Sequence, residues 1–461
     1  MTPGLKALQG SVTAKVVFIG VLILILLIPL GMIEGLVNER QYLYGTARDD
    51  IAQAWGQSQT VGGPILIVPF TYTRYIADEA IVNAERRAIT VKDELYVLPQ
   101  VLEIRGTADA EERRRGIYKV PVYTTRLTAT GVFPPVTLDG SEYPDLTVLW
   151  EQAAIALPIT DARYVREPIV LASGNGTTSF EAGGARVPGF GPLLVAPYAA
   201  LGLGPLTAAQ AFSFELALGG TGALKFLPLG DETRVAVTSD WPSPSFVGAF
   251  LPGERTVDAN GFTAEWRVLD LGRGYPSSWK RTGAPPADVE LSAFGAELIT
   301  PVGIHEAAMR ATKYGVLILG FTFVAYFLFE LFAALRLHAL QYLLIGLANC
   351  VFYLLLLALA EHIGFAPAYV ASAVAATALI TSYSGAVLRS VRRAAPIGAL
   401  LTALYGYLYV TLKAEDYALL FGALGVFAVL AAFMYLTRHV DWFDVTFGRK
   451  TDDDARVQLH A

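Results

Sequence analysis

The residues of this sequence that are best able to do chemistry are ionisable side chains inside long apolar stretches. Glu330 lies in an apolar run at positions 313–336, and Glu361 and His362 close the run that follows. A charge at the centre of a bilayer is costly, so such groups are rarely kept without a partner or a function. The polar candidates in and between these two runs are Glu330, Arg336, His338, Gln341, Asn349, Tyr353, Glu361 and His362.

Two interpretations of Glu330 are open. In the favoured one, its carboxylate pairs with Arg336 or His338 and fixes the turn between two helices. In the other, Glu330 takes up a proton or an ion, as intramembrane carboxylates of pumps and transporters do.

Glu361 and His362 are expected to form a docking ion pair at the opposite end of their helix. The partners available there are His305, Glu306, Arg310 and Lys313. Gln341 and Glu361 are twenty residues apart, about 30 Å along a helix, so the two groups cannot form one site. Asn349 and Tyr353 are the polar residues of this helix between those two positions. Tyr342 is interpreted as an anchor at the membrane interface.

Enzyme motifs in the water-soluble part of the chain are weak or absent. Ser277 and Lys280 have SxxK spacing, but the companion motifs of serine enzymes are missing, as are HExxH and GxSxG. The single cysteine, Cys350, excludes an intrachain disulfide and a thiolate metal cage. We therefore expect no catalytic site, no metal site and no cofactor. The net charge of -6 argues against nucleic-acid binding, which depends on clustered positive charge.

A rigid aromatic segment is the best candidate for an interaction loop in that part of the chain. It contains Trp241, Pro242, Pro244 and Phe246. Proline fixes φ and removes a donor, so the segment should be extended and could present both rings to a partner. Burial of both rings in the core is an equal alternative. The basic run 113–115 beside Glu111 and Glu112 is interpreted as a solvated hairpin face.

Six apolar segments must position the membrane residues. Hydrophobic residues make up 54% of the chain and charged residues only 16%, which is too apolar for an average soluble protein. The run 313–336 is long enough, at about 33 Å of helix, to cross a hydrocarbon core of roughly 30 Å. The run 16–37 is interpreted as an uncleaved signal anchor rather than a cleaved signal. The other spans are expected at about 340–360, 366–388, 396–412 and 417–436.

The intervening region, 38–312, is predicted to be rich in β-strands. An amphipathic helix over about 38–60 leads off the membrane, and alternating or β-branched runs follow at 62–75, around 87–133 and at 211–271. No alternating strand and helix rhythm appears, so antiparallel sheets packed as a sandwich are expected. The fold class is thus a membrane protein of mixed α+β type, with a six-span helical region (one plus five spans) and a large β-rich domain.

The distribution of Lys and Arg predicts the orientation. Basic residues cluster at the N-terminus, at 389–393 and in the tail, whereas the short loops on the other side hold only Lys413. The predicted domains are a cytoplasmic N-terminus at 1–15, a signal anchor at 16–37, a periplasmic domain at 38–312, a five-helix bundle at 313–436 and a cytoplasmic tail at 437–461.

Several motifs resemble one known family. They include Lys313-Tyr314-Gly315, Phe329-Glu330, Gln341-Tyr342-Leu343 and Glu361-His362 in the membrane part, and Arg115-Gly116-Ile117-Tyr118, Ser239-Asp240-Trp241-Pro242 and Phe250-Leu251-Pro252 outside it. Together they resemble the CreD family of bacterial inner-membrane proteins. Ala339 and Ala360 stand where that family usually has proline and serine. The resemblance implies a role in cell-envelope integrity and the response to envelope stress, with no catalytic residues to carry over.

The function expected is therefore non-enzymatic. The outer domain would bind another envelope protein or a cell-wall component, while the bundle anchors the chain in the lipid bilayer of the inner membrane. The alternative is a transporter or ion-coupled device that uses Glu330, His338 and Glu361. An enzyme acting on wall or lipid material is a third and weaker alternative.

Overall fold

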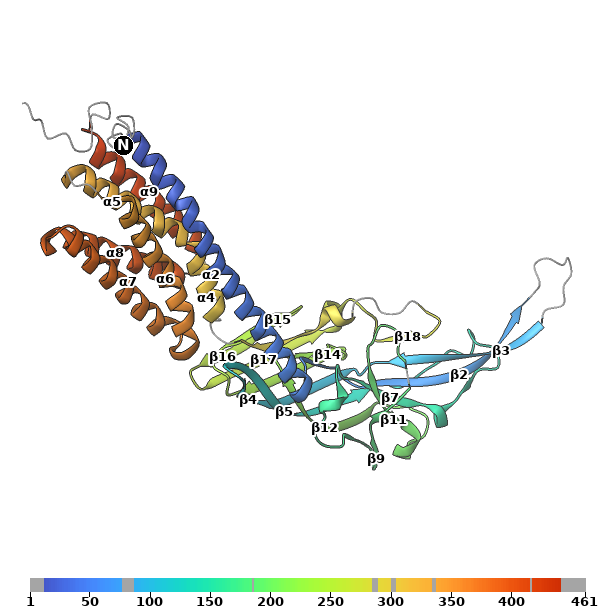
Figure 1. The fold of residues 1–461 in the computed structure, drawn as a ribbon. Coiled ribbons are helices and arrows are strands. Elements are labelled where there is room, and N and C mark those ends of the chain that lie inside the picture. Colours follow the sequence, from blue (N-terminus) through green and yellow to red (C-terminus); the bar gives the residue numbers. More distant parts are fainter. Residues whose placement is uncertain are drawn as a thin grey trace, which may run out of the picture. The chain divides into compact units, whose positions relative to one another are not determined.

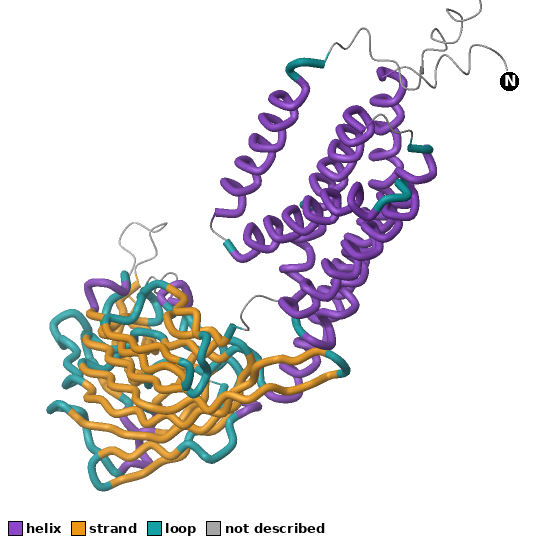
Figure 2. Tube along the Cα trace, turned by 90° about the vertical axis from the view of Figure 1, so that its left-hand side faces the viewer, coloured by secondary structure: helices purple, strands orange, loops and turns teal. Residues whose placement is uncertain are grey.

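The chain folds into a helical unit and a β-rich unit. A computed structural model describes residues 12–76, 87–184, 186–283, 289–299, 304–333, 337–414 and 417–440. The helical unit comprises Met1–Tyr44 and Val302–Ala461, and the β-rich unit comprises Gly45–Pro301. Figure 1 labels the helices and strands, and Figure 2 distinguishes the helices from the sheets by colour.

Six helices in the described part of the chain are long and apolar enough to cross a membrane, which confirms the prediction of one plus five spans. One of these spans, Glu306–Phe332, combines α4 with α5. Where the bilayer begins and ends along the helices stays a prediction. The long helices are α2 (Val12–Trp55), α4 (Ile304–Lys313), α5 (Gly315–Ala333), α6 (Ala339–Ile363), α7 (Phe365–Val387), α8 (Val391–Lys413) and α9 (Ala418–Thr437).

Helix α2 differs from the prediction. A span and a separate amphipathic helix were expected, but α2 is a single helix of 44 residues, with Pro29 inside it. At 1.5 Å per residue it is about 66 Å long, more than twice the thickness of a hydrocarbon core. Its first three quarters belong to the helical unit and its last turns, from Gly45, to the β-rich unit.

The helical unit has a core shared by α2, α5 and α6. Leu26 and Leu30 of α2 are buried together with Phe323 of α5 and Phe352 of α6. Gly346 of α6 lies where any Cβ would collide with Leu26, so this glycine lets α2 approach α6 closely. The N-terminal helix is therefore packed into the bundle.

The β-rich unit contains three sheets. The four-stranded sheet has the order β1 (Gln59–Val61), β13 (Ala223–Phe226), β19 (Phe294–Leu298), β15 (Pro244–Gly248). The seven-stranded sheet has the order β10 (Glu181–Ala182), β11 (Leu193–Pro197), β7 (Ala154–Pro158), β2 (Ile65–Ile76), β3 (Arg87–Val97), β18 (Ser278–Lys280), with β6 (Thr147–Val148) paired to β2. The eight-stranded sheet has the order β16 (Glu254–Asp258), β17 (Gly261–Leu269), β14 (Glu232–Ser239), β4 (Val101–Arg115), β5 (Tyr118–Phe133), β12 (Gln210–Thr221), β8 (Val170–Ser173), β9 (Gly176–Ser179).

Most strand pairs are antiparallel, as predicted, but two are parallel. β14 pairs with β4 in parallel, and so does β1 with β13. Buried side chains from all three sheets form one core. In β5, Leu127 and Ala129 point into this core while Arg126, Thr128 and Thr130 face solvent, the alternation typical of a half-buried strand. Burial of each large apolar side chain stabilises the unit by about 1.5–3 kcal/mol.

Trp55 fastens the end of α2 to the β-rich unit. Its ring lies between two guanidinium groups, 4.2 Å from that of Arg113 and 4.5 Å from that of Arg166. Its indole N–H donates to the Tyr123 carbonyl at 3.2 Å. Gly56 then ends the helix with φ +130°, a conformation that favours glycine, and packs directly against Gly219. We call Trp55, Arg113, Arg166 and Tyr123 the Trp55 clamp.

The β4–β5 hairpin that contributes Arg113 is exposed, as predicted. It also contacts the end of α2. Arg115 forms an ion pair with Asp50 at 2.8 Å. The chain leaves the unit close to where it enters, because Ser58 donates to the Thr221 carbonyl at 3.0 Å and the Leu298 N–H donates to Gly222 at 2.9 Å. Both connections therefore join the β-rich unit at one place.

We predict that Trp55→Ala loosens the β-rich unit by about 2–3 kcal/mol, because the change removes buried ring area and two cation–π contacts. Trp55→Phe keeps a ring between the two arginines and should lose less than half as much. Thermal unfolding of the full chain in detergent, followed by protease resistance of the β-rich unit, measures this. Unchanged resistance in Trp55→Ala would contradict the clamp.

Candidate functional site

Glu330 is the centre of a buried polar cluster near the first turn of α2. Its side chain is fully buried and forms an ion pair with Lys15. The same carboxylate accepts the Leu337 N–H at 3.1 Å and the Tyr342 hydroxyl at 3.0 Å. Lys15 also donates to the Leu337 carbonyl at 3.4 Å. The cluster thus joins the start of α2, the end of α5 and the start of α6.

The partner of Glu330 is one that the sequence analysis missed. Arg336 lies outside the described residues, and His338 contacts other groups. His338 is the N-cap of α6, where its Nδ1 accepts the Leu340 N–H at 3.2 Å while Gln341 accepts the His338 N–H at 2.8 Å. This is a capping box, a structural role. Tyr342 was interpreted as an interfacial anchor, which is wrong, because it is fully buried against Glu330.

The second intramembrane carboxylate also pairs with α2. Arg40 Nε lies 3.4 Å from Oε1 of Glu361, whereas His362 is exposed. Lys15 and Arg40 are 25 residues apart on one helix, about 37 Å. The two ion pairs therefore bracket the apolar part of α2 and hold it against α5 and α6 at both ends. The side chain of His305 is not among those described.

Asn349 belongs to a separate polar chain inside the bundle. Its amide oxygen accepts the Tyr405 hydroxyl at 2.9 Å, and the Tyr405 carbonyl accepts the Tyr369 hydroxyl at 2.6 Å. Tyr353 is buried nearby on α6, and its hydroxyl has no hydrogen-bond partner in the described part of the chain. No hydrogen bond among the described residues links this chain to Glu330 or Glu361, so these groups do not form a continuous relay there.

The proposed aromatic interaction loop is part of the core. Trp241 is only 9% exposed, and its indole N–H donates to the Ile299 carbonyl at 2.9 Å. Pro244 and Phe246 lie in β15, so the segment is extended as predicted, but the Phe246 ring packs edge-on to Phe262 and Trp266. Pro242 is the exposed member of the set. The structure thus buries Trp241 in the core and leaves Phe246 half-buried against it.

The SxxK residues have different partners. Ser277 donates to Asp231 and accepts from the buried Arg273 at 2.7 Å, while Lys280 bonds the Tyr143 hydroxyl. Among the described residues, no group of three or more His, Cys, Asp or Glu side chains is arranged to hold a metal ion.

A furrow on the β-rich unit is the best-formed binding surface outside the membrane part. Three adjoining depressions of about 350, 390 and 510 Å³ share lining residues: Glu167 and Pro168 line the first and second, and Ala162, Ala182 and Leu194 the second and third. We call the three together the furrow. The sequence analysis did not find it, because its residues come from β5, β8, β12 and the segments beside β7 and β10.

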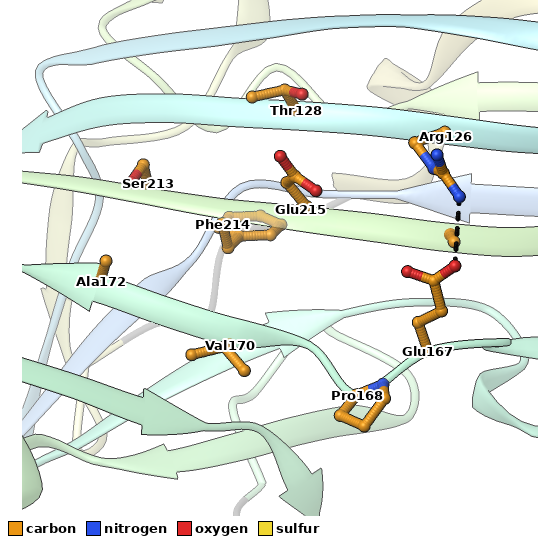
Figure 3. Close-up of a pocket in the computed structure, with 10 residues that line it drawn as sticks. Arg126, Thr128, Glu167, Pro168, Val170, Ala172, Ser213, Phe214 and Glu215 are labelled. Carbon is orange, nitrogen blue, oxygen red and sulfur yellow. Dashed lines mark hydrogen bonds and ion pairs between the residues drawn. The ribbon is translucent and has the colours of Figure 1, made fainter.

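The furrow carries balanced charge above a partly apolar floor. Figure 3 shows Arg126 facing Glu167, which it contacts at 3.1 Å, with Thr128 and Glu215 beside them. The Arg163 guanidinium donates to Asp161 and so holds the pKa of that carboxyl below its usual range, which keeps both groups charged near neutral pH. Ile169 and Phe180 are buried beneath.

The furrow also runs along the open edge of one sheet. β10, which contains Ala182, is the edge strand of the seven-stranded sheet, and β8 with Val170 lies next to the edge strand β9 of the eight-stranded sheet. Edge strands offer backbone donors and acceptors that an extended chain can pair with. The furrow has side chains of both charges and lies beside backbone groups that can pair with another strand. These features suit an extended polypeptide better than a polyanion.

We predict that Lys15→Met destabilises the helical unit by about 3–5 kcal/mol, because it leaves a buried carboxylate without its cation. Glu330→Gln should cost less, since Lys15 keeps partial solvent access and the amide oxygen still accepts hydrogen bonds. The double variant Lys15→Met, Glu330→Gln should recover much of the loss. A double-mutant cycle of thermal unfolding in detergent measures the coupling, and additive losses would contradict the pairing.

The comparisons with known proteins agree with one another over nearly the whole chain. Residues 11–443 match the family described as Inner membrane protein CreD. The chain is 32% identical over 456 residues to the Inner membrane protein CreD of Escherichia coli (strain K12), a match that covers 94% of this chain and 96% of that protein. With its membrane helices and its large β-rich unit, the chain belongs to the CreD family of inner-membrane proteins.

Proposed function

We propose that this protein supports the integrity of the cell envelope and its response to stress by binding, without catalysis, an extended polypeptide segment of another envelope protein in the furrow. The furrow carries the proposal, because it combines an open sheet edge, balanced charge and three adjoining depressions. Family membership supports an envelope role. An ion-coupled device is not favoured, since Glu330 and Glu361 are each engaged by a cation of α2.

The proposal places the β-rich unit in the periplasm and both termini in the cytoplasm. The basic residues at 389–393 support this orientation, because short cytoplasmic loops are enriched in Lys and Arg. In this arrangement the Lys15–Glu330 pair lies near the cytoplasmic face and the Arg40–Glu361 pair near the periplasmic face.

Reporter insertion tests the orientation. An enzyme that is active only outside the cytoplasm should be active when inserted at the exposed turn after Asp258 and inactive when inserted after Arg389. The reverse pattern would place the furrow in the cytoplasm and remove its access to periplasmic partners.

Filling the furrow tests the function. We expect Thr128→Trp to fail to restore resistance to envelope-directed agents in cells that lack the chromosomal copy, because the indole occupies the space of the bound segment. Thr238→Trp changes the same solvent-facing side of the sheet on β14, away from the furrow, and should restore resistance like the unmodified chain. Immunoblots of membranes check that both variants are present at normal abundance. Equal resistance with both variants would contradict the proposal.

Photo-crosslinking identifies the bound molecule. A photoreactive amino acid at Val170 should capture an envelope polypeptide in living cells, and one at Thr238 should capture none. Adducts of glycan without protein at Val170 would show that the furrow holds cell-wall material instead, and an absence of adducts would count against binding.

A further inference from the structure

Helix α9 contacts its neighbours closely at a few residues of its first half. The Tyr407 hydroxyl of α8 donates to the Phe421 carbonyl, and Gly425 packs against the same tyrosine ring. Gly422 lies beside Tyr314. Further along, Leu430 is 54% exposed and Met434 63% exposed. Figure 2 shows α9, the helix that leads into the C-terminal trace, standing apart from the other helices.

A crevice of about 470 Å³ lies between the second half of α9, the length of α5 and the middle of α8. Twelve residues line it, and all are Phe, Leu, Val or Ala. No lining side chain therefore offers a hydrogen bond. A hydrocarbon in a crevice of this kind gains dispersion contacts with each wall and so stabilises the attachment of α9.

The size of the crevice limits which molecule can occupy it. A transmembrane helix is about 10–12 Å wide and 30 Å long, so its volume is roughly 2,000–3,000 Å³, several times that of the crevice. A helix of a second copy of this chain or of another membrane protein is therefore too large to enter the crevice. A flexible hydrocarbon chain fits both the volume and the apolar lining.

The crevice extends to the last turns of α5 and α9, and a cation follows at the end of α9. Phe332 and Leu436, near the ends of α5 and α9, line it, and Arg438 follows two residues after Leu436. Arg438 is exposed and stacks its guanidinium over the Tyr435 ring at 4.1 Å. Its other contact in the described part of the chain is His439, so no described carboxylate neutralises its charge. Arginine is well suited to bind a phosphate.

We propose that this crevice is a binding site for one phospholipid, with an acyl chain between α5, α8 and α9 and the anionic phosphate at Arg438. The lipid acts as a structural ligand that completes the packing of α9. The assignment does not depend on the furrow, on the orientation of the chain or on the proposed envelope role.

Native mass spectrometry of the full chain in mild detergent tests the acyl-chain site. One adduct with the mass of a phospholipid should remain on the unmodified chain and be lost in Ala432→Phe, which fills the crevice from α9. Ala423→Phe is the matched control, because residue 423 lies about half a turn around the same helix, and this variant should keep the adduct. Ala325→Phe fills the crevice from α5 and should reproduce the loss if Ala432→Phe folds poorly. Equal retention in all variants, or a chain that carries no adduct, would overturn the site.

A second arm tests the phosphate. The delipidated chain in nanodiscs should retain phosphatidylglycerol about ten-fold better than diacylglycerol with the same acyl chains, which corresponds to ~1.4 kcal/mol. Arg438→Gln should abolish that preference without removing the acyl-chain adduct. Equal retention of both lipids by the unmodified chain would overturn the role of Arg438, and an adduct with the mass of a second protein chain would overturn the choice of occupant.

Discussion

A carboxylate that is buried in a membrane protein needs a cation and hydrogen bonds, and this requirement organises the helical unit. Glu330 meets it with Lys15, the Leu337 N–H and the Tyr342 hydroxyl. For Glu361 the cation is Arg40. Because both cations come from α2, satisfying the two carboxylates fixes where the N-terminal helix packs and how far it can slide. A wrong register would leave charges unpaired in a medium of low dielectric, which is strongly unfavourable.

The end of α2, from Gly45 on, belongs to the β-rich unit. Its last turn ends in the Trp55 clamp, where two guanidinium groups cover the indole and Gly56 allows close contact with Gly219. The chain leaves the same unit nearby, through Leu298 and Gly222.

The furrow and the crevice suit different ligands for a physical reason. The furrow has charged walls, buried apolar side chains beneath it and a nearby sheet edge, so a ligand there must satisfy polar backbone as well as apolar groups. The crevice is lined only by hydrocarbon and aromatic side chains and lies among membrane helices, so a ligand there gains chiefly dispersion contacts. The lining of the furrow therefore suits a ligand that comes from water, and the lining of the crevice suits a ligand that comes from the lipid bilayer.

The sequence by itself determined the number of membrane helices, the β-rich character of the intervening region and the family. These properties follow from local patterns: an apolar run of about 20 residues, an alternation in strands such as β5, and short motifs such as Gln341-Tyr342-Leu343. Only the tertiary structure decided that Lys15 pairs with Glu330 across 315 positions, that α2 is one helix clamped at Trp55, and that Trp241 faces the core. It also brought together the separate segments that line the furrow. The physical reason is that hydropathy and propensity act over a few neighbouring residues, whereas the pairing of a buried charge or ring depends on which distant segments pack beside it.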